Sequence, residues 1–279
     1  MQNRFVHLTA KKWGDLIPPS NEWQFIIKIL SMKEENLKQA QKMQEDFLKQ
    51  TWLASPLIIS VAGSVSVGKS TFAEELRHKL VEYNSTRKIQ VVSADSFIMS
   101  NSELKAKNLM DEKGFPSSFD WESMANFLAA VKSSTRNIPY RVYSHELSDL
   151  SDKIEYIDQP DILIIEGINM LQKAPGNNLS PNDFVDFSIY LDASRENLEN
   201  WYLERFHQMM KLNKDNPGNF FYQWAHKPLT EADNFAHEVW RTVNLKNLNE
   251  YIAPTKERAD MILRKNYDHS VSDIYLRKI

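Results

Sequence analysis

The stretch VAGSVSVGKST, from Val61 to Thr71, decides the fold of this chain. It contains the motif G-x-x-x-x-G-K-[ST] in full, between an apolar run, LIISVA, and a helical pattern, STFAEELRHKL. In such a loop the backbone N–H groups converge on one anion, and the lysine reaches the outer phosphates of a nucleotide. The alternative is a glycine-rich turn with an exposed lysine. The residues predicted to hold the nucleotide are Gly63, Ser64, Val65, Ser66, Val67, Gly68, Lys69, Ser70 and Thr71.

A second apolar run, DILIIEG, ends in Glu166. Four apolar residues precede this glutamate and place it at the carboxyl end of a strand, where a magnesium ion beside a nucleotide would lie. The hydroxyl of Ser70 is the other expected magnesium ligand. The alternative is a glutamate that only precedes a turn glycine. With the phosphate loop, these residues predict a nucleoside triphosphate bound together with Mg²⁺.

The rest of the chain has the rhythm of a doubly wound α/β fold. Short β-branched runs at 56–63, 89–95, 161–167, 187–193 and 259–265 alternate with helical patterns, as in parallel sheets that are covered on both faces. We therefore predict a P-loop NTPase-type, mostly parallel sheet whose ligands lie outside the carboxyl ends of the strands.

This division of the chain predicts two main parts and two long segments within the second of them. Residues 1–54 are predicted to form an N-terminal helical extension and residues 55–279 the kinase catalytic domain. Residues 96–160 are predicted as a helix-and-loop insertion, and residues 194–253 as a helical lid that carries part of the substrate pocket.

Composition narrows the kind of partner. The chain has 279 residues, a net charge of −3 and no cysteine. A nearly neutral balance does not indicate nucleic acid or a membrane surface as the main partner. The lack of cysteine excludes disulfides and fits a reducing compartment. Because neither a signal peptide nor a run near the ~18 apolar residues of a membrane span is evident, we expect a cytoplasmic protein that acts on a small molecule.

Several classes of nucleotide-binding protein remain open. A GTPase is disfavoured because N-K-x-D is absent; at Asn213–Asp215 the aspartate comes one position early. A small-molecule kinase needs a carboxylate near the attacking hydroxyl, and Asp95, which closes the run IQVVSAD, offers one. Alternatively, Asp95 caps a turn. From a different class, a non-catalytic protein that switches partners on binding ATP is also consistent with the loop.

A helical pattern after Ser194 carries the next candidates. Tyr202 and Arg205 are three residues apart and therefore lie on one face, where the arginine can reach over the transferred phosphoryl group. The alternative for Arg205 is a solvated ion pair. The aromatic stretch at 219–226 either walls the pocket or packs within the lid, and we favour packing.

Taken in order, these residues resemble the bacterial type I pantothenate kinases. The motifs that carry the resemblance are GSVSVGKST, the strand end at Asp95, KGFP, VYSH, QPDILIIEG, DFVDFSIYLDA, WYLERF, VNLKNL and PTKERADMIL. The resemblance covers the chain from about Trp52 to the C-terminus. Uridine kinases and phosphoribulokinases share the loop and the sheet but not KGFP, VYSH and PTKERA together, and they are the alternative among kinases.

The resemblance implies ATP-dependent phosphorylation of the primary hydroxyl of pantothenate to 4'-phosphopantothenate, the first step of coenzyme A biosynthesis. It implies that Lys69 and Ser70 hold phosphate and magnesium, that Asp95 is the base, and that Arg205 stabilises the transferring phosphoryl group. It implies substrate binding by Lys113, Tyr143, His145, Tyr202 and Asn244, whose polar groups suit a carboxylate, an amide and hydroxyls. A homodimer is implied by the resemblance alone.

One departure from the family concerns regulation. Family members are commonly inhibited by coenzyme A, which overlaps the ATP site and is assisted by a basic residue after the phosphate loop and an aromatic in the lid. Glu74 and Met209 stand at these places here. Because an acidic side chain repels the phosphates of coenzyme A, we expect weakened feedback inhibition.

Overall fold

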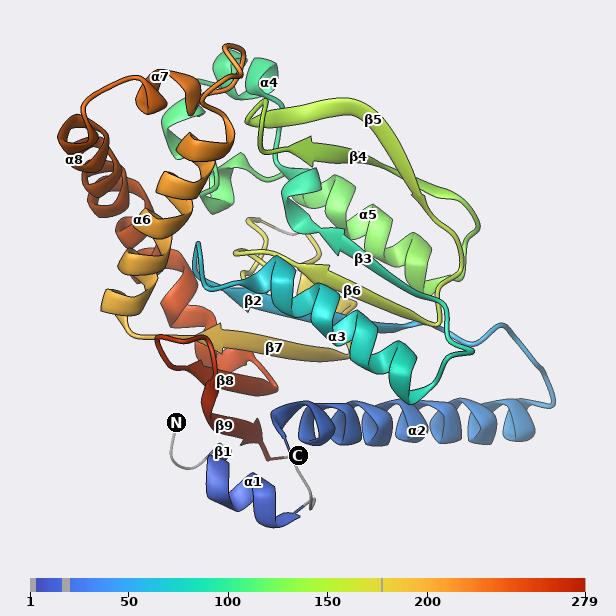
Figure 1. Ribbon diagram of the computed structural model, residues 1–279. Coiled ribbons are helices and arrows are strands. Elements are labelled where there is room, and N and C mark those ends of the chain that lie inside the picture. The colour runs from blue at the N-terminus through green and yellow to red at the C-terminus, as the bar shows by residue number, and fades with distance from the viewer. Residues whose placement is uncertain (1–3, 17–20, 177, 279) are drawn as a thin grey trace.

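The computed structural model describes residues 4–16, 21–176 and 178–278. Its centre is a seven-stranded sheet in the order β1-β9-β8-β7-β2-β6-β3 (Figure 1). The five strands from β8 to β3 are mutually parallel. They are β8 (Met261–Lys265), β7 (Phe187–Asp192), β2 (Leu57–Gly63), β6 (Ile162–Glu166) and β3 (Ile89–Ser93). The predicted parallel sheet is confirmed, since each predicted run contains one of these strands.

The central strands β2 and β6 are apolar except for Ser60 and the terminal Glu166, as expected where both faces of the sheet are covered. Every residue of β2 and of β6 is buried. Helix α3 (Lys69–Tyr83) crosses one face (Figure 1) and buries Phe72, Ala73, Leu76 and Leu80, a helical spacing. Helix α2 (Glu22–Leu48) packs against α3, where Trp23 stacks on Phe72 with ring centres 4.9 Å apart.

The N-terminal segment is only partly helical. Phe5–Thr9 forms β1, which pairs antiparallel with β9 (Val271–Arg277) at the edge of the sheet and leads into α1 (Ala10–Leu16). The prediction of helix for residues 1–54 is therefore wrong for β1. Five residues with two buried apolar side chains give too short a pattern, and the pairing with β9 decides the conformation. The domain boundary at residue 54 stays a prediction.

The insertion contains a β-hairpin that was not predicted. β4 (Ile138–Ser144) and β5 (Asp149–Ile157) form a two-stranded antiparallel sheet, so the prediction of only helices and loops there is wrong. Polar residues lie on both faces of these strands, which obscures the alternation expected of a half-buried strand. The predicted helical parts are present as α4 (Asn101–Ala106) and α5 (Trp121–Lys132).

Residues 194–253 are mainly helical, as expected, and lie at the carboxyl ends of the parallel strands (Figure 1). That they act as a lid stays a prediction, and the segment is called the lid below. Its elements are α6 (Arg195–Leu212), α7 (Tyr222–Ala225), α8 (Leu229–Val239), a π-helical turn (Trp240–Asn244), α9 (Leu245–Asn247) and a second π-helical turn (Leu248–Ile252). Ser194 caps α6 by accepting from the Asn197 N–H at 3.1 Å.

Short 3₁₀ turns complete the chain at Ala94–Phe97, Met110–Glu112, Pro116–Ser118, Pro181–Asp183 and Ala253–Arg258. Within the described part of the chain, no helix has both the length and the apolar character that crossing a bilayer requires.

Candidate active site

The predicted phosphate loop connects β2 to α3. Gly63 and Gly68 have φ of +148° and +88°, conformations that favour glycine. A Cβ on Gly63 would lie 2.7 Å from the Leu191 carbonyl oxygen, because Gly63 ends β2 directly beside Leu191 of β7. Lys69 begins α3, and its Nζ donates to the Ser64 carbonyl at 2.9 Å. The lysine is thus folded back over the loop, as a phosphate cradle requires.

Three neighbouring strands bring the acidic residues to this loop. Glu166 ends β6, between β2 and β3, and lies opposite Val61 and Ser93 in the register. Ser70 Oγ donates to Glu166 Oε1 at 2.9 Å. One carboxylate and one hydroxyl are hard oxygen donors of the kind that Mg²⁺ uses together with substrate phosphates. This donor pair therefore fits a magnesium ion that is bound together with a nucleotide.

Asp95 follows β3 in a 3₁₀ turn, and the turn is capped by Ser93, whose Oγ accepts from the Asp95 N–H at 3.4 Å. The Asp95 carboxylate is therefore not the cap of its own turn. Burial and the nearby Glu166 raise the pKa of Asp95, while Lys69 opposes the rise. Burial lowers the pKa of Lys69, against the attraction of Glu166 and Asp95. A carboxylate with a raised pKa is suited to accept a proton near neutral pH.

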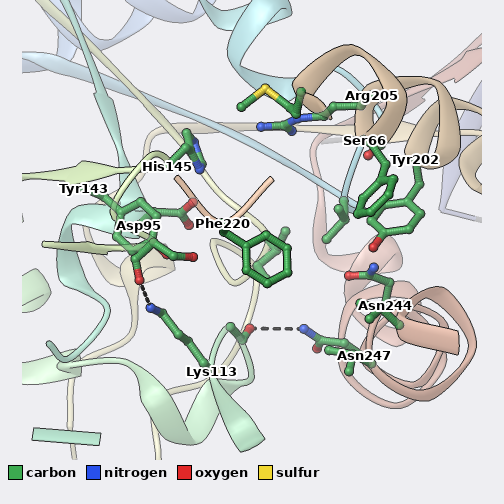
Figure 2. A pocket seen from close by; sticks show the side chains of 18 of the residues that line it. Ser66, Asp95, Lys113, Tyr143, His145, Tyr202, Arg205, Phe220, Asn244 and Asn247 are labelled. Carbon is green, nitrogen blue, oxygen red and sulfur yellow. Dashed lines mark hydrogen bonds between the residues drawn. The ribbon is translucent and has the colours of Figure 1, made fainter. Parts of the chain in front are cut away.

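One cavity of about 460 Å³ joins these groups to the residues predicted to bind substrate (Figure 2). The predicted residues that line it are Lys69, Ser70, Asp95, Lys113, Tyr143, His145, Glu166, Tyr202, Arg205 and Asn244, with Val65 and Ser66 of the loop. Gly63, Ser64, Val67, Gly68 and Thr71 are not among its lining residues. The phosphate loop and the predicted substrate residues thus share one cavity.

The hairpin and the KGFP loop form one side of the cavity. Tyr143 and His145 have ring centres 5.4 Å apart, and Lys113 Nζ lies 5.4 Å from the centre of the Tyr143 ring. Lys113 Nζ also donates to Asn101 Oδ1 at 2.6 Å and to the Ser148 carbonyl. Burial lowers the pKa of His145, although Asp95 opposes this shift, and a lowered pKa favours the neutral imidazole.

The lid forms the other side (Figure 2). Tyr202 of α6 points toward Asn244 of the first π-helical turn (Figure 2). The Arg205 side chain lines the cavity, and among the described residues no carboxylate forms an ion pair with it. Arg205 therefore faces the cavity and is not held in the solvated ion pair that was its alternative.

Among the aromatic residues at 219–226, some pack within the lid and others line the cavity. Trp224 stacks on Phe235 with ring centres 4.0 Å apart, next to a small buried cluster around Phe206. Phe220 and Phe221 line the cavity. The preference for packing is correct for Trp224 and wrong for Phe220, which is 44% exposed.

Sequence reasoning missed several residues that line the cavity. Asn247 lies three residues after Asn244, a spacing that places both on one face of a helix and could have indicated it. The apolar lining residues Ile98, Ile168, Val239 and Val243 carry no signal that distinguishes a pocket wall from a core.

Fold and site together define a P-loop kinase, and comparison with known proteins gives the same class. The model of the phosphoribulokinase/uridine kinase family matches residues 58–208. A putative fructose transport system kinase from Silicibacter is similar in fold, with a TM-score of 0.56 at 22% identity over 74% of this chain and 87% of that chain.

The curated relatives are more specific. The pantothenate kinase of Latilactobacillus sakei is 42% identical over 251 residues, which cover 90% of this chain and 81% of the relative. That of Enterococcus faecalis is 45% identical over 83% of this chain and 76% of the relative. The chain belongs to the pantothenate kinases within the phosphoribulokinase/uridine kinase family. Membership of a P-loop kinase family implies that it uses ATP.

Proposed function

We propose that the protein transfers the γ-phosphoryl group of ATP to the primary hydroxyl of pantothenate and forms 4'-phosphopantothenate, the first step of coenzyme A biosynthesis. The observation that carries the proposal is the shared cavity, which is lined by the phosphate loop and by all five residues expected to bind pantothenate. The similarity to pantothenate kinases over 90% of the chain supports the choice of acceptor.

The chemistry proceeds by direct transfer. The Asp95 carboxylate accepts the proton of the primary hydroxyl as the hydroxyl oxygen bonds to the γ-phosphorus, and the bond from that phosphorus to the β–γ bridging oxygen breaks. ADP leaves with that oxygen. Lys69 and Arg205, which lie near Asp95, neutralise the charge on the transferring group. No phosphoenzyme is formed.

Ser70 and Glu166 would hold Mg²⁺ beside the nucleotide, since they supply a hydroxyl at the start of α3 and a carboxylate at the end of β6. When bound, the ion neutralises charge on the β- and γ-phosphates. The backbone of residues 63–71 would hold the phosphates themselves.

We assign the two sides of the cavity to different parts of the acceptor molecule. Lys113, Tyr143 and His145 lie on the Asp95 side, and we assign them to the hydroxyl-bearing end of pantothenate. Tyr202 and Asn244 lie opposite and are assigned to the remainder of the molecule (Figure 2). Their phenol and amide groups can pair with the substrate amide and carboxylate.

The test is ADP release from Mg-ATP with pantothenate, uridine or ribulose 5-phosphate as acceptor. Pantothenate alone is expected to stimulate release. Stimulation by uridine or ribulose 5-phosphate instead would assign the protein to another kinase activity of the family. Tight ATP binding with no acceptor-dependent release would favour the non-catalytic switch.

Weakened inhibition by coenzyme A belongs to the same proposal. Glu74 lies on α3 soon after the phosphate loop, with its side chain 52% exposed and paired with Arg77 at 2.8 Å. A Glu74→Arg variant is expected to bind coenzyme A about fivefold more tightly, since one exposed charge contact contributes ~1 kcal/mol. Strong inhibition of the unaltered protein by micromolar coenzyme A at low ATP would refute the proposal.

Three further properties complete the proposal. The family resemblance supports a homodimer, which light scattering of the purified protein tests. The use of ATP and the place of the reaction in coenzyme A biosynthesis support a cytoplasmic location. We also propose residues 55–279 as the catalytic domain, which limited proteolysis of the N-terminal extension would examine.

A further inference from the structure

Buried side chains form hydrogen bonds with both the backbone N–H and the backbone carbonyl of Gly114. Its N–H donates to Ser118 Oγ at 2.9 Å. Its carbonyl accepts from Asn247 Nδ2 at 3.1 Å and from Asn169 Nδ2 at 3.4 Å (Figure 2 draws the first of these). Ser118 is 0% exposed, Asn247 4% and Asn169 1%. These four residues form the Gly114 clamp, and the φ of +86° at Gly114 sets the turn directly after Lys113.

The Gly114 clamp joins three separate parts of the molecule. Ser118 belongs to the same loop as Lys113. Asn169 follows β6, three residues after Glu166. Asn247 comes from α9 in the lid. The loop that carries Lys113 is therefore fixed both to the strand that ends in Glu166 and to the lid.

Two side-chain contacts strengthen the connection between this loop and the lid. The rings of Phe115 and Tyr251 meet edge to face with centres 5.7 Å apart. Lys246 Nζ lies 5.9 Å from the centre of the Phe115 ring. Lys246 and Tyr251, which lie on either side of Asn247 in the sequence, therefore both contact Phe115 of this loop.

A contribution to the stability of the fold does not by itself explain why asparagine stands at positions 169 and 247. Within the described part of the chain, the amide oxygens of Asn169 and Asn247 are buried without a hydrogen-bond partner. A buried polar atom without a partner is destabilising. Buried polar groups that are kept despite such a cost are commonly found where a site must be held in one geometry.

We propose that the Gly114 clamp positions Lys113 in the cavity, and that Asn247 is a positioning residue for binding of the acceptor substrate. Lys113 Nζ is directed by Asn101 Oδ1 and the Ser148 carbonyl on one side of the cavity. Releasing Gly114 changes the direction of the backbone next to Lys113 and misplaces its ammonium group. The inference rests on the proposed function, since it takes Lys113 to contact pantothenate.

The first test is the variant Asn247→Leu, which keeps similar volume but removes both the donor and the unpaired oxygen. It is expected to raise KM for pantothenate about tenfold, as for one misplaced hydrogen-bonding group, with KM for ATP changed less than about twofold. The matched control is Asn213→Leu. Asn213 is a lid asparagine, 7% exposed, whose Nδ2 donates to the Met209 carbonyl at 2.9 Å and makes no contact with Gly114. The control is expected to lower Tm without the selective rise in KM.

A double-mutant cycle with Lys113→Met separates positioning from a general structural effect. If Asn247 acts through Lys113, Asn247→Leu raises KM for pantothenate in the unaltered background and adds nothing in the Lys113→Met background. A tenfold rise in both backgrounds would overturn the inference. An unchanged KM in the single variant would overturn it as well.

Hydrogen–deuterium exchange over residues 111–118 tests the clamp without using activity. Asn247→Leu is expected to speed exchange there relative to the unaltered protein and to Asn213→Leu. If the unaltered protein does not phosphorylate pantothenate while this difference is seen, the proposed function fails and the clamp stands. Equal exchange in all three proteins would refute the clamp itself.

Discussion

Replacing Asp95 by Asn is expected to lower turnover and raise thermal stability at the same time. Asn is nearly isosteric with Asp, and the turn around residue 95 is capped by Ser93, so the local backbone keeps its support. Loss of a general base typically costs about 10²- to 10⁴-fold in rate. At 1.36 kcal/mol per tenfold, this corresponds to about 3–5 kcal/mol in the activation barrier. Binding of ATP is expected to change little, because the phosphate loop and Lys69 are untouched.

The stability gain follows from the raised pKa of Asp95. Burial and Glu166 raise this pKa above its value of 3.8 in the unfolded chain. The folded protein therefore holds the proton more tightly, and stability is lost as pH rises through the folded-state pKa. At neutral pH the buried carboxylate destabilises the fold, and Asn removes that cost. The gain in Tm should shrink as pH falls below the folded-state pKa and vanish well below 3.8, where the carboxyl is neutral in both states.

The control is Asp273→Asn, for which the expected change in Tm has the opposite sign. A hydrogen bond from His7 lowers the pKa of Asp273, so its carboxylate stabilises the fold at neutral pH. Its replacement should lower Tm and leave turnover unchanged. Steady-state kinetics, ATP titration and thermal melts of both variants are the assays. If Asp95→Asn lowers Tm and ATP affinity in step with turnover, Asp95 has a structural role and the reasoning is refuted.

Three further changes have defined outcomes. Gly63→Ala forces the loop away from the Leu191 carbonyl by about 0.7 Å to reach an ordinary 3.4 Å contact, and should reduce kcat/KM for ATP about 10- to 100-fold. Its control is Gly176→Ala, where φ is also positive but the added Cβ would meet no atom of the described residues within 4 Å apart from its chain neighbours, and which should lower stability alone. Equal kinetic losses in the two variants would refute the steric argument. The acid limb of the pH–rate profile should titrate above the ordinary 3.8 of an aspartate, because the pKa of Asp95 is raised, and full activity down to pH 4 would contradict its role as base. Arg205→Ala should lower kcat about 10³-fold with a smaller effect on ATP binding, whereas a purely thermal effect in melts would assign Arg205 to the fold.

The fold was largely predictable because strands that are buried on both faces are apolar throughout. The run at Ile162–Ile165 could not be mistaken for a surface element, and its position before Glu166 located the edge of the sheet where ligands bind. β1 and the β4–β5 hairpin lacked this signal. β1 is an edge strand of five residues whose partner, β9, lies at the other end of the chain. The hairpin strands are close in sequence, but polar side chains on both of their faces hide the strand pattern.

The candidate site was predictable to the extent that function follows from position at a strand end. The phosphate loop, Glu166 and Asp95 were found in this way. Lys113, Tyr143, His145 and Asn244 were proposed only from the family resemblance, because nothing local distinguishes them from other loop or helix residues. Asn247 and Asn169 escaped prediction, since their shared partner Gly114 is 133 and 55 residues distant and is reached only in the folded chain.

The most direct test of the central claim is to follow the γ-phosphoryl group itself. The purified protein is incubated with γ-labelled Mg-ATP and pantothenate, and the product is analysed by mass spectrometry and phosphorus NMR. We expect the label in a phosphomonoester on the primary hydroxyl of pantothenate, formed in equal amount to ADP. Label recovered only as inorganic phosphate, or no transfer despite ATP binding, would contradict the account.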